Sequence, residues 1–185
     1  MTASQRRITF FTDDAADNRY TGPTTGDERA LLVHTLMAQR ATLEIKCAGL
    51  TEQLGERSAA PSALSLLGLI RHLTDVERRW FRRDLAGQDA QPLYPTEDNP
   101  DYDIDGAVTA PDAESVAAAW EAWRAEVEFA ERLVAEAPDL DIEGESPWRG
   151  TVSLRWVLLH VIQEYARHNG HADLLRERID GAVGL

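Results

Sequence analysis

The sequence predicts an all-α protein built as a four-helix bundle. Four stretches carry apolar residues at the spacing of an amphipathic helix, at about residues 27–54, 63–86, 111–137 and 153–180. No stretch shows a long alternation of apolar and polar residues, which is the pattern of a half-buried strand. Breaks that contain proline and glycine separate the four stretches, as expected for the connections of a bundle.

The chain has 185 residues and is expected to form one bundle domain over residues 25–185. Residues 1–24 mix Ile8, Phe10 and Phe11 with polar residues, glycine and proline. We expect an irregular N-terminal arm there, whose aromatic side chains pack on the body of the protein.

The charge balance excludes two classes of partner. Thirty-two acidic residues outnumber nineteen basic ones, so the net charge is −13. A nucleic acid or an anionic membrane surface would require a basic patch. No apolar run approaches the roughly 18 residues that span a bilayer, and the first residues lack the apolar core of a secretory signal. A cytoplasmic location is therefore expected.

The single cysteine, Cys47, permits no internal disulfide and no site with several thiolates. It falls in the first predicted helix. We expect it to be a small core residue rather than a nucleophile.

The first two helices have recognisable starts. Thr25 and Glu28 have the spacing of a capping box, which predicts that Thr25 caps the first helix. A polar break over residues 55–61 ends that helix, and Ser62 is expected to cap the second one.

The second helix carries an apolar stripe made of Leu66, Leu69, Leu73, Val76 and Trp80. His72 lies at the margin of this stripe, and Ser65 and Asp75 lie near the same edge, where they could support it. A histidine at such a place fits a packed side chain with a hydrogen-bond partner, and it also fits a metal ligand.

The longest break, residues 87–110, is rich in proline and acidic residues. A loop of this length predicts a lid, a binding loop or a crossover along the bundle. Pro111 is expected to open the third helix, in which Trp120 and Trp123 belong to the core. Residues 138–152 are expected to form a loop.

The fourth helix is expected to begin after Ser153 and to stop at Gly181. Its apolar stripe consists of Leu154, Val157, Val161, Leu175 and Ile179. Glu164 and His168 fall inside this stripe at about 100° per residue. A buried carboxylate and a buried imidazole are costly unless they are paired or bind a ligand.

These residues suggest a metal site. Glu164 and His168 lie four apart on one helical face and can point at a common atom, and His72 could supply a third ligand. Two histidines and one carboxylate with open positions suit catalytic zinc, and the same set suits nickel or non-haem iron. His160 and His171 could compete as ligands, but we expect them at the rim or behind the ligands.

A structural alternative remains, in which Glu164 and His168 only hydrogen-bond each other or a neighbouring helix. Other catalytic patterns are disfavoured. The Glu-x-x-His motif of di-iron bundles, the His-Glu-x-x-His motif of zinc proteases and glycine-rich phosphate loops do not occur.

Several segments resemble the DinB/YfiT-like superfamily, and more narrowly its DUF664 branch. The strongest are LLGLIRHLTDVERRWF at residues 66–81 and LRWVLLHVIQEYARHNGHADLLRER at residues 154–178. The phrases AQRATL at residues 38–43 and KCAGL at residues 46–50 also fit. The resemblance covers residues 25–182.

The resemblance implies an up-down-down-up bundle with a crossover between helices two and three. The metal set of the superfamily has one histidine on helix two and two histidines four apart on helix four. On this chain these positions are His72, Glu164 and His168. Glu164 departs from the three-histidine form, and the resulting set resembles that of mycothiol-dependent isomerases.

The resemblance further implies a divalent metal ion, with zinc expected before nickel or iron, and a low-molecular-weight thiol such as mycothiol or bacillithiol. The first hypothesis is therefore a metal-dependent thiol S-transferase or isomerase acting on a small electrophile. Trp80, Arg83 and the loop over residues 87–110 would line its cleft.

The second hypothesis is a non-catalytic metal-binding or stress-related bundle, in which His160 or His171 completes the coordination of the ion. Since members of the superfamily are often dimers, a homodimer is expected under either hypothesis.

Overall fold

The computed structural model describes residue 17, residues 19–107 and residues 109–184. Ile8, Phe10 and Phe11, which we expected to pack on the body, lie outside the described residues. The division into an arm and a bundle domain therefore stays a prediction.

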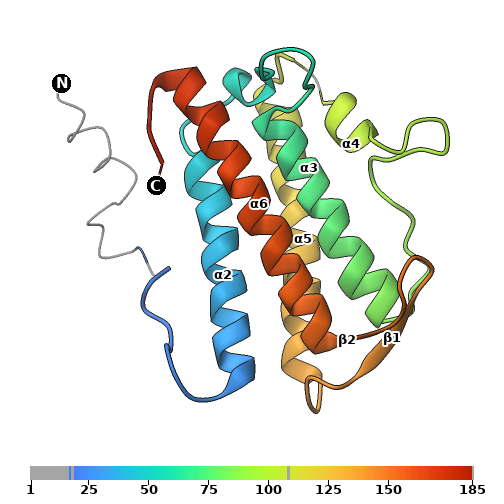
Figure 1. Cartoon of the computed structure of the whole chain (residues 1–185). Helices are drawn as coiled ribbons and strands as arrows, with labels where there is room; N and C mark the ends of the chain where they lie inside the picture. The colour runs from blue at the N-terminus through green and yellow to red at the C-terminus, as the bar shows by residue number, and fades with distance from the viewer. Residues whose placement is uncertain (1–16, 18, 108, 185) are drawn as a thin grey trace.

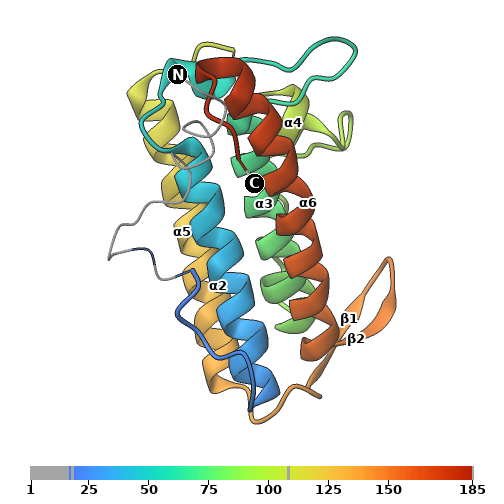
Figure 2. The same cartoon turned by 60° about the vertical axis from the view of Figure 1, so that its left-hand side comes forward.

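Four long helices confirm the all-α class: α2 (Glu28–Cys47), α3 (Leu66–Glu77), α5 (Ala113–Glu136) and α6 (Leu154–Asp180). Figure 1 shows α2 and α6 running in one direction and α3 and α5 in the other. The order is therefore up-down-down-up, as the resemblance implied. The connection from α3 to α5 returns along the outside of the bundle, because both helices start at the same end (Figures 1 and 2).

The remaining elements are short: a 3-10 helix η1 (Glu52–Gly55), a π-helical segment η2 (Arg78–Leu85), α4 (Tyr102–Asp105), β1 (Glu143–Ser146) and β2 (Gly150–Ser153). Figure 1 places α4 beside the first half of α3 and the β1–β2 hairpin beside the opposite end. This placement matters below, because the cavity lies between them and α6.

Local sequence explains where the helices begin and end. Ser153 caps α6 by accepting a hydrogen bond from the backbone of Trp156, and Gly181 ends this helix in the left-handed region, at φ 78°. Both predictions are confirmed. The start expected at Thr25 is wrong, because Asp27 accepts from the backbone of Ala30 and caps α2.

Other helix boundaries also differ from those expected from the sequence. Ser65, and not Ser62, caps α3 by accepting from the backbone of Gly68. The first helix ends at Cys47 rather than near residue 54, and Gly49 follows with φ 74°. Such a backbone conformation favours glycine and breaks the helix. At α5, Asp112 is the cap and the helix starts at Ala113.

Residues 138–152 are not only a loop, as we had expected. They contain an antiparallel hairpin, in which Glu143 pairs with Ser153 and Ser146 with Gly150. Four-residue strands are too short to show alternation, so the sequence pattern could not reveal them. Gly144 packs against η2 so closely that a Cβ there would lie 2.1 Å from the carbonyl oxygen of Asp84.

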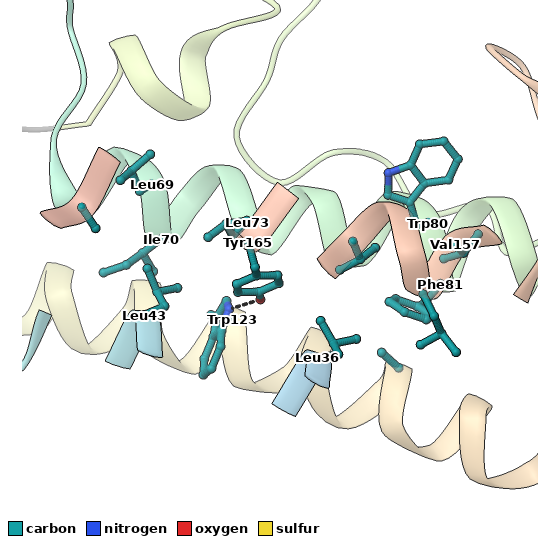
Figure 3. Close-up of a cluster of buried hydrophobic side chains, with 14 of the residues drawn as sticks. Leu36, Leu43, Leu69, Ile70, Leu73, Trp80, Phe81, Trp123, Val157 and Tyr165 are labelled. Atoms are coloured by element: carbon teal, nitrogen blue, oxygen red, sulfur yellow. Dashed lines mark hydrogen bonds between the residues drawn. The ribbon is translucent and has the colours of Figure 1, made fainter. Parts of the chain in front are cut away.

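The core lies between the four helices and contains leucines of α2 and α3, Phe81, Trp123 and Tyr165 (Figure 3). Trp123 is buried as expected, whereas Trp120 is only partly buried. Cys47 is a buried core residue, also as expected. Among the described residues, no helix combines the length and the apolar character that crossing a membrane requires.

Candidate metal centre

The fold brings the three predicted ligands together. His72 comes from α3, and Glu164 and His168 come from α6; one ligand atom of each lies within 4.8 Å of the others. The Glu164 Oε2 atom is 3.4 Å from His168 Nε2 and 3.9 Å from His72 Nε2. Ligand atoms at about 2.0–2.2 Å from a tetrahedral zinc ion lie about 3.3–3.6 Å apart. The cluster therefore fits a small divalent ion after minor side-chain movements.

The burial of these residues differs from our expectation. His168 is buried, with 7% of its surface exposed, but the side chain of Glu164 is 22% exposed and lies at the edge of the buried face. The next residue, Tyr165, is fully buried and occupies the centre of that face. His160, with a 16% exposed side chain, is as deep as Glu164, so depth alone does not separate ligands from neighbours.

An aspartate that the sequence did not indicate orients His72. The Nδ1 atom of His72 lies 2.7 Å from the Oδ2 atom of Asp103, which is itself buried. The N–H at Nδ1 donates to this carboxylate, so Nε2 is the atom that faces Glu164 and that would bind an ion. A carboxylate behind a ligating histidine fixes the tautomer and raises the basicity of the ligand.

Neither residue that we expected to support His72 does so. Ser65 caps α3, and Asp75 accepts hydrogen bonds from the backbone of Leu93 and Tyr94 at 2.7 and 3.1 Å. Asp103 was missed because it is 31 residues from His72 and reaches it from the crossover loop.

The two remaining histidines of α6 lie beside the cluster. His171 Nδ1 is 3.3 Å from His168 Nδ1, on the side of the ring that faces away from Glu164. His160 Nε2 is 3.7 Å from Glu164 Oε1, and its ring stacks on Trp156 at a centroid distance of 4.8 Å. The three-residue cluster forms without either of them.

The electrostatics suit a cation. Burial lowers the pKa of His72, but the hydrogen bonds to Asp103 and Glu164 and the charges of these carboxylates have a larger, opposite effect. The pKa is therefore raised, to about 9. His168 and His72 hold the pKa of Glu164 well below its usual range. Burial lowers the pKa of His160. The cluster thus combines the carboxylate of Glu164 with a positively charged imidazole at His72, and a divalent ion can replace a proton there.

A cavity of about 420 Å³ opens beside the cluster, and both His72 and Glu164 line it. This volume is in the range of small-molecule sites. Trp80 and Arg83, which we expected at a cleft, both line the cavity. Further walls come from the crossover loop and from the hairpin through Pro92, Pro95, Pro100, Asp101, Asp103 and Trp148.

The crossover loop forms a fixed wall, because α3 holds it at several points. Asp75 binds two of its backbone amides, and Arg78 donates to the carbonyl of Gln91 at 2.6 Å. Arg71 donates to the carbonyls of Tyr102 and Gly106, each at 2.8 Å. Of the roles that the sequence left open for this loop, the structure favours a crossover that carries binding residues.

An up-down-down-up bundle with a His/Glu/His cluster between α3 and α6 is the architecture expected of the DinB/YfiT-like superfamily. The chain belongs to the mycothiol-S-transferase (MST) family, whose model matches residues 31–181. No curated protein matches the chain.

A solved structure described as a conserved protein from Enterococcus faecalis is similar, with a TM-score of 0.63 and 17% sequence identity. The match covers 85% of this chain and 99% of that chain. At this identity, the likeness supports the fold alone.

Proposed function

We propose that this chain is a divalent-metal-dependent thiol S-transferase, with mycothiol or another low-molecular-weight thiol as one substrate and a small electrophile as the other. One observation carries the proposal: His72, Glu164 and His168 converge at the edge of a cavity of small-molecule size. Membership of the mycothiol-S-transferase family supports the thiol as co-substrate.

The chain's own residues would each have a defined part. His72, held by Asp103, and His168, backed by His171, would present their Nε2 atoms, and Glu164 would supply the anionic ligand. A divalent ion held there would lower the pKa of a thiol and so favour the thiolate at neutral pH. Zinc is the first choice, and nickel or iron suits the same ligands.

The transfer needs no reactant other than the thiol and the electrophile. The thiol proton passes to solvent, and the thiolate sulfur forms a bond to an electrophilic carbon. The electron pair of the broken bond departs with the leaving group or, in an addition, moves to a conjugated carbonyl that then takes up a proton. In an isomerase, the same sulfur–carbon bond would form first and would break later, which releases the thiol.

The arrangement favours this enzyme over the non-catalytic alternative. That alternative requires a fourth protein ligand, but His171 faces the rear of His168 and His160 stacks on Trp156. Glu164 and His72 also border the cavity, so a substrate can reach them.

The test is the metal content of the untagged protein, measured by mass spectrometry beside His72→Ala and His168→Ala. We expect about one metal ion per chain, lost in both variants. His34→Ala is the matched control, because His34 on α2 contacts the backbone of Gly22 and Arg19 and is not part of the cluster, so metal content should not change. Full metal content in His168→Ala would show that the ligand set is wrong.

The metal-loaded protein would then be assayed for loss of free thiol with mycothiol and a panel of electrophiles. Transfer that depends on the metal and on His72 would support the enzyme. A protein that binds its ion but turns over none of these pairs would favour the non-catalytic alternative.

A further inference from the structure

The wall of the cavity on the hairpin side carries positive charge and an exposed aromatic ring. We propose that Arg79, Arg83 and Trp148 form a subsite for a carboxylate attached to an aromatic ring, which selects aromatic acids as the electrophilic substrates. This inference rests on the proposed function only where it makes the bound acid an electrophilic substrate. The binding of an aromatic carboxylate depends on the subsite alone.

Two guanidinium groups share a single carboxylate. Arg83 Nε lies 3.2 Å from Asp84 Oδ1, and Arg79 Nε lies 3.8 Å from Asp84 Oδ2. The side chain of Asp84 is completely buried, whereas those of Arg79 and Arg83 are 37% and 32% exposed. One positive charge is therefore left over, and both arginines line the cavity.

Of the other charged groups that line the cavity, His72 and Glu164 belong to the candidate metal centre, and the exposed Asp101 lies at the α4 end. Arg78 forms an ion pair with Glu126 at 2.7 Å. Asp103 binds His72, and Asp75 binds backbone amides of the crossover loop. These carboxylates belong to the α4 end of the cavity or to its middle, and the hairpin lies at the opposite end of α3 (Figure 1).

The hairpin adds an aromatic surface to this positive charge. Trp148 lies in the turn between β1 and β2, lines the cavity and is 58% exposed. The guanidinium groups of Arg79 and Arg149 lie 5.4 and 4.2 Å from its ring centre. A large exposed aromatic side chain beside cations offers stacking area together with electrostatic attraction.

The subsite is close to the candidate metal centre. The rings of Trp148 and Trp80 are 6.2 Å apart, and the ring of Trp80 is 4.8 Å from that of His160. His160 lies 3.7 Å from Glu164. A ligand whose carboxylate binds Arg79 and Arg83 therefore extends along the tryptophans toward Glu164.

The chemistry of arginine favours a carboxylate. Its planar guanidinium binds a carboxylate through two parallel hydrogen bonds and stacks on rings. The chain as a whole carries a net charge of −13, so anions in general are repelled. A local positive patch that persists in such a protein is well suited to select an anionic substrate.

Isothermal titration calorimetry of the full chain tests the subsite with three probes: 2-naphthoate, the neutral analogue 2-naphthalenemethanol, and propanoate, which has the carboxylate without the ring. We expect 2-naphthoate to bind at least about tenfold more tightly than either of the others. Equal affinity for the acid and the alcohol would overturn the role of the arginines, and equal affinity for propanoate would overturn the role of the ring.

Variants locate the binding. Arg83→Gln and Trp148→Ala should each weaken 2-naphthoate binding about tenfold, and Arg132→Gln should leave it unchanged, because Arg132 pairs with Glu128 on the exposed side of α5. Trp148→Ala removes an exposed side chain and keeps the test valid if Arg83→Gln folds poorly. Unchanged affinity in Trp148→Ala would overturn the subsite.

The measurement needs neither a thiol nor turnover. If the protein binds 2-naphthoate but transfers no thiol, the subsite is supported and the proposed function is contradicted. If it is an active transferase that does not bind 2-naphthoate, only the subsite is contradicted.

Discussion

Arg40 of α2 and Glu77 of α3 form a buried bidentate ion pair, with N···O distances of 2.8 and 2.7 Å. The hydroxyl of Tyr165 on α6 donates to Glu77 at 2.9 Å, and the indole N–H of Trp123 on α5 donates to that hydroxyl at 2.8 Å. Figure 3 shows the bond from Trp123 to Tyr165 at the centre of the core. One polar network thus joins all four long helices.

We expect Glu77→Gln to lower the free energy of unfolding by about 3–5 kcal/mol, because Arg40 would remain buried without its counter-charge. Urea denaturation followed by circular dichroism measures this loss. Glu131→Gln is the matched control: Glu131 lies 3.5 Å from Arg40 but its side chain is 57% exposed, so the change should stay below about 1 kcal/mol. Equal losses in both variants would contradict the central role of Glu77.

The hairpin depends on a glycine. We expect Gly144→Ala to destabilise the protein by about 1–3 kcal/mol, since the added Cβ would meet the backbone of Asp84 and Leu85 at 2.1 and 2.6 Å. Gly170→Ala is the control within α6, where nothing lies within 4 Å of the added Cβ. Helix propensity predicts that this second change stabilises by up to about 1 kcal/mol. Thermal unfolding compares the two, and a neutral Gly144→Ala would show that the hairpin can shift freely.

Cys47 should resist alkylation in the folded protein. Burial raises the pKa of its thiol to about 12. Only the thiolate reacts, and at pH 8, which is below this pKa, about one thiol in ten thousand is ionised. Raising the pH toward 12 would increase the reactive fraction.

Iodoacetamide at pH 8, followed by mass spectrometry, should therefore modify Cys47 only after urea is added. Rapid and complete labelling of the folded protein would contradict the burial of Cys47, and would make it a candidate nucleophile.

Asp103 should tune the affinity for metal without being a ligand. Asp103→Asn removes the carboxylate that orients His72, so we expect the dissociation constant for zinc to rise about 10–100-fold. Competition with a chromogenic chelator measures the constant. Asp101→Asn removes an exposed carboxylate two residues away in the same loop and should change it less than twofold. A similar effect of both substitutions would point to the overall charge of the loop.

The parts of the fold that depend on local sequence were predictable. Ser153 and Gly181 mark the ends of α6 because a cap acts on its own neighbours. The choice between two nearby candidate caps was not predictable from the sequence. Ser62 and Ser65 are equally good caps, and only tertiary packing decides between them. The π-helical segment η2 and the hairpin interlock at Gly144, and this contact between distant segments leaves no periodic trace in the sequence.

The candidate site was predictable to the same extent. Spacing placed Glu164 and His168 on one face and left His72 as a third ligand, a set that the resemblance also implied; these three do come together. The expectation that Glu164 lies mid-stripe was wrong, because the buried face of α6 also includes Leu158, Tyr165 and Ala172. These residues centre the face on Tyr165 and leave Glu164 at its edge. Asp103 reaches the site from a loop, and loop positions cannot be read from helical periodicity.

The anchoring of the crossover loop has a thermodynamic consequence for ligand binding. Arg71, Asp75 and Arg78 already hold this segment against α3 through its backbone. A ligand that enters the cavity therefore meets a surface whose conformational entropy was lost when the protein folded. Almost none of the interaction energy is then consumed in ordering the loop, and even a small molecule with few contacts can bind with useful affinity.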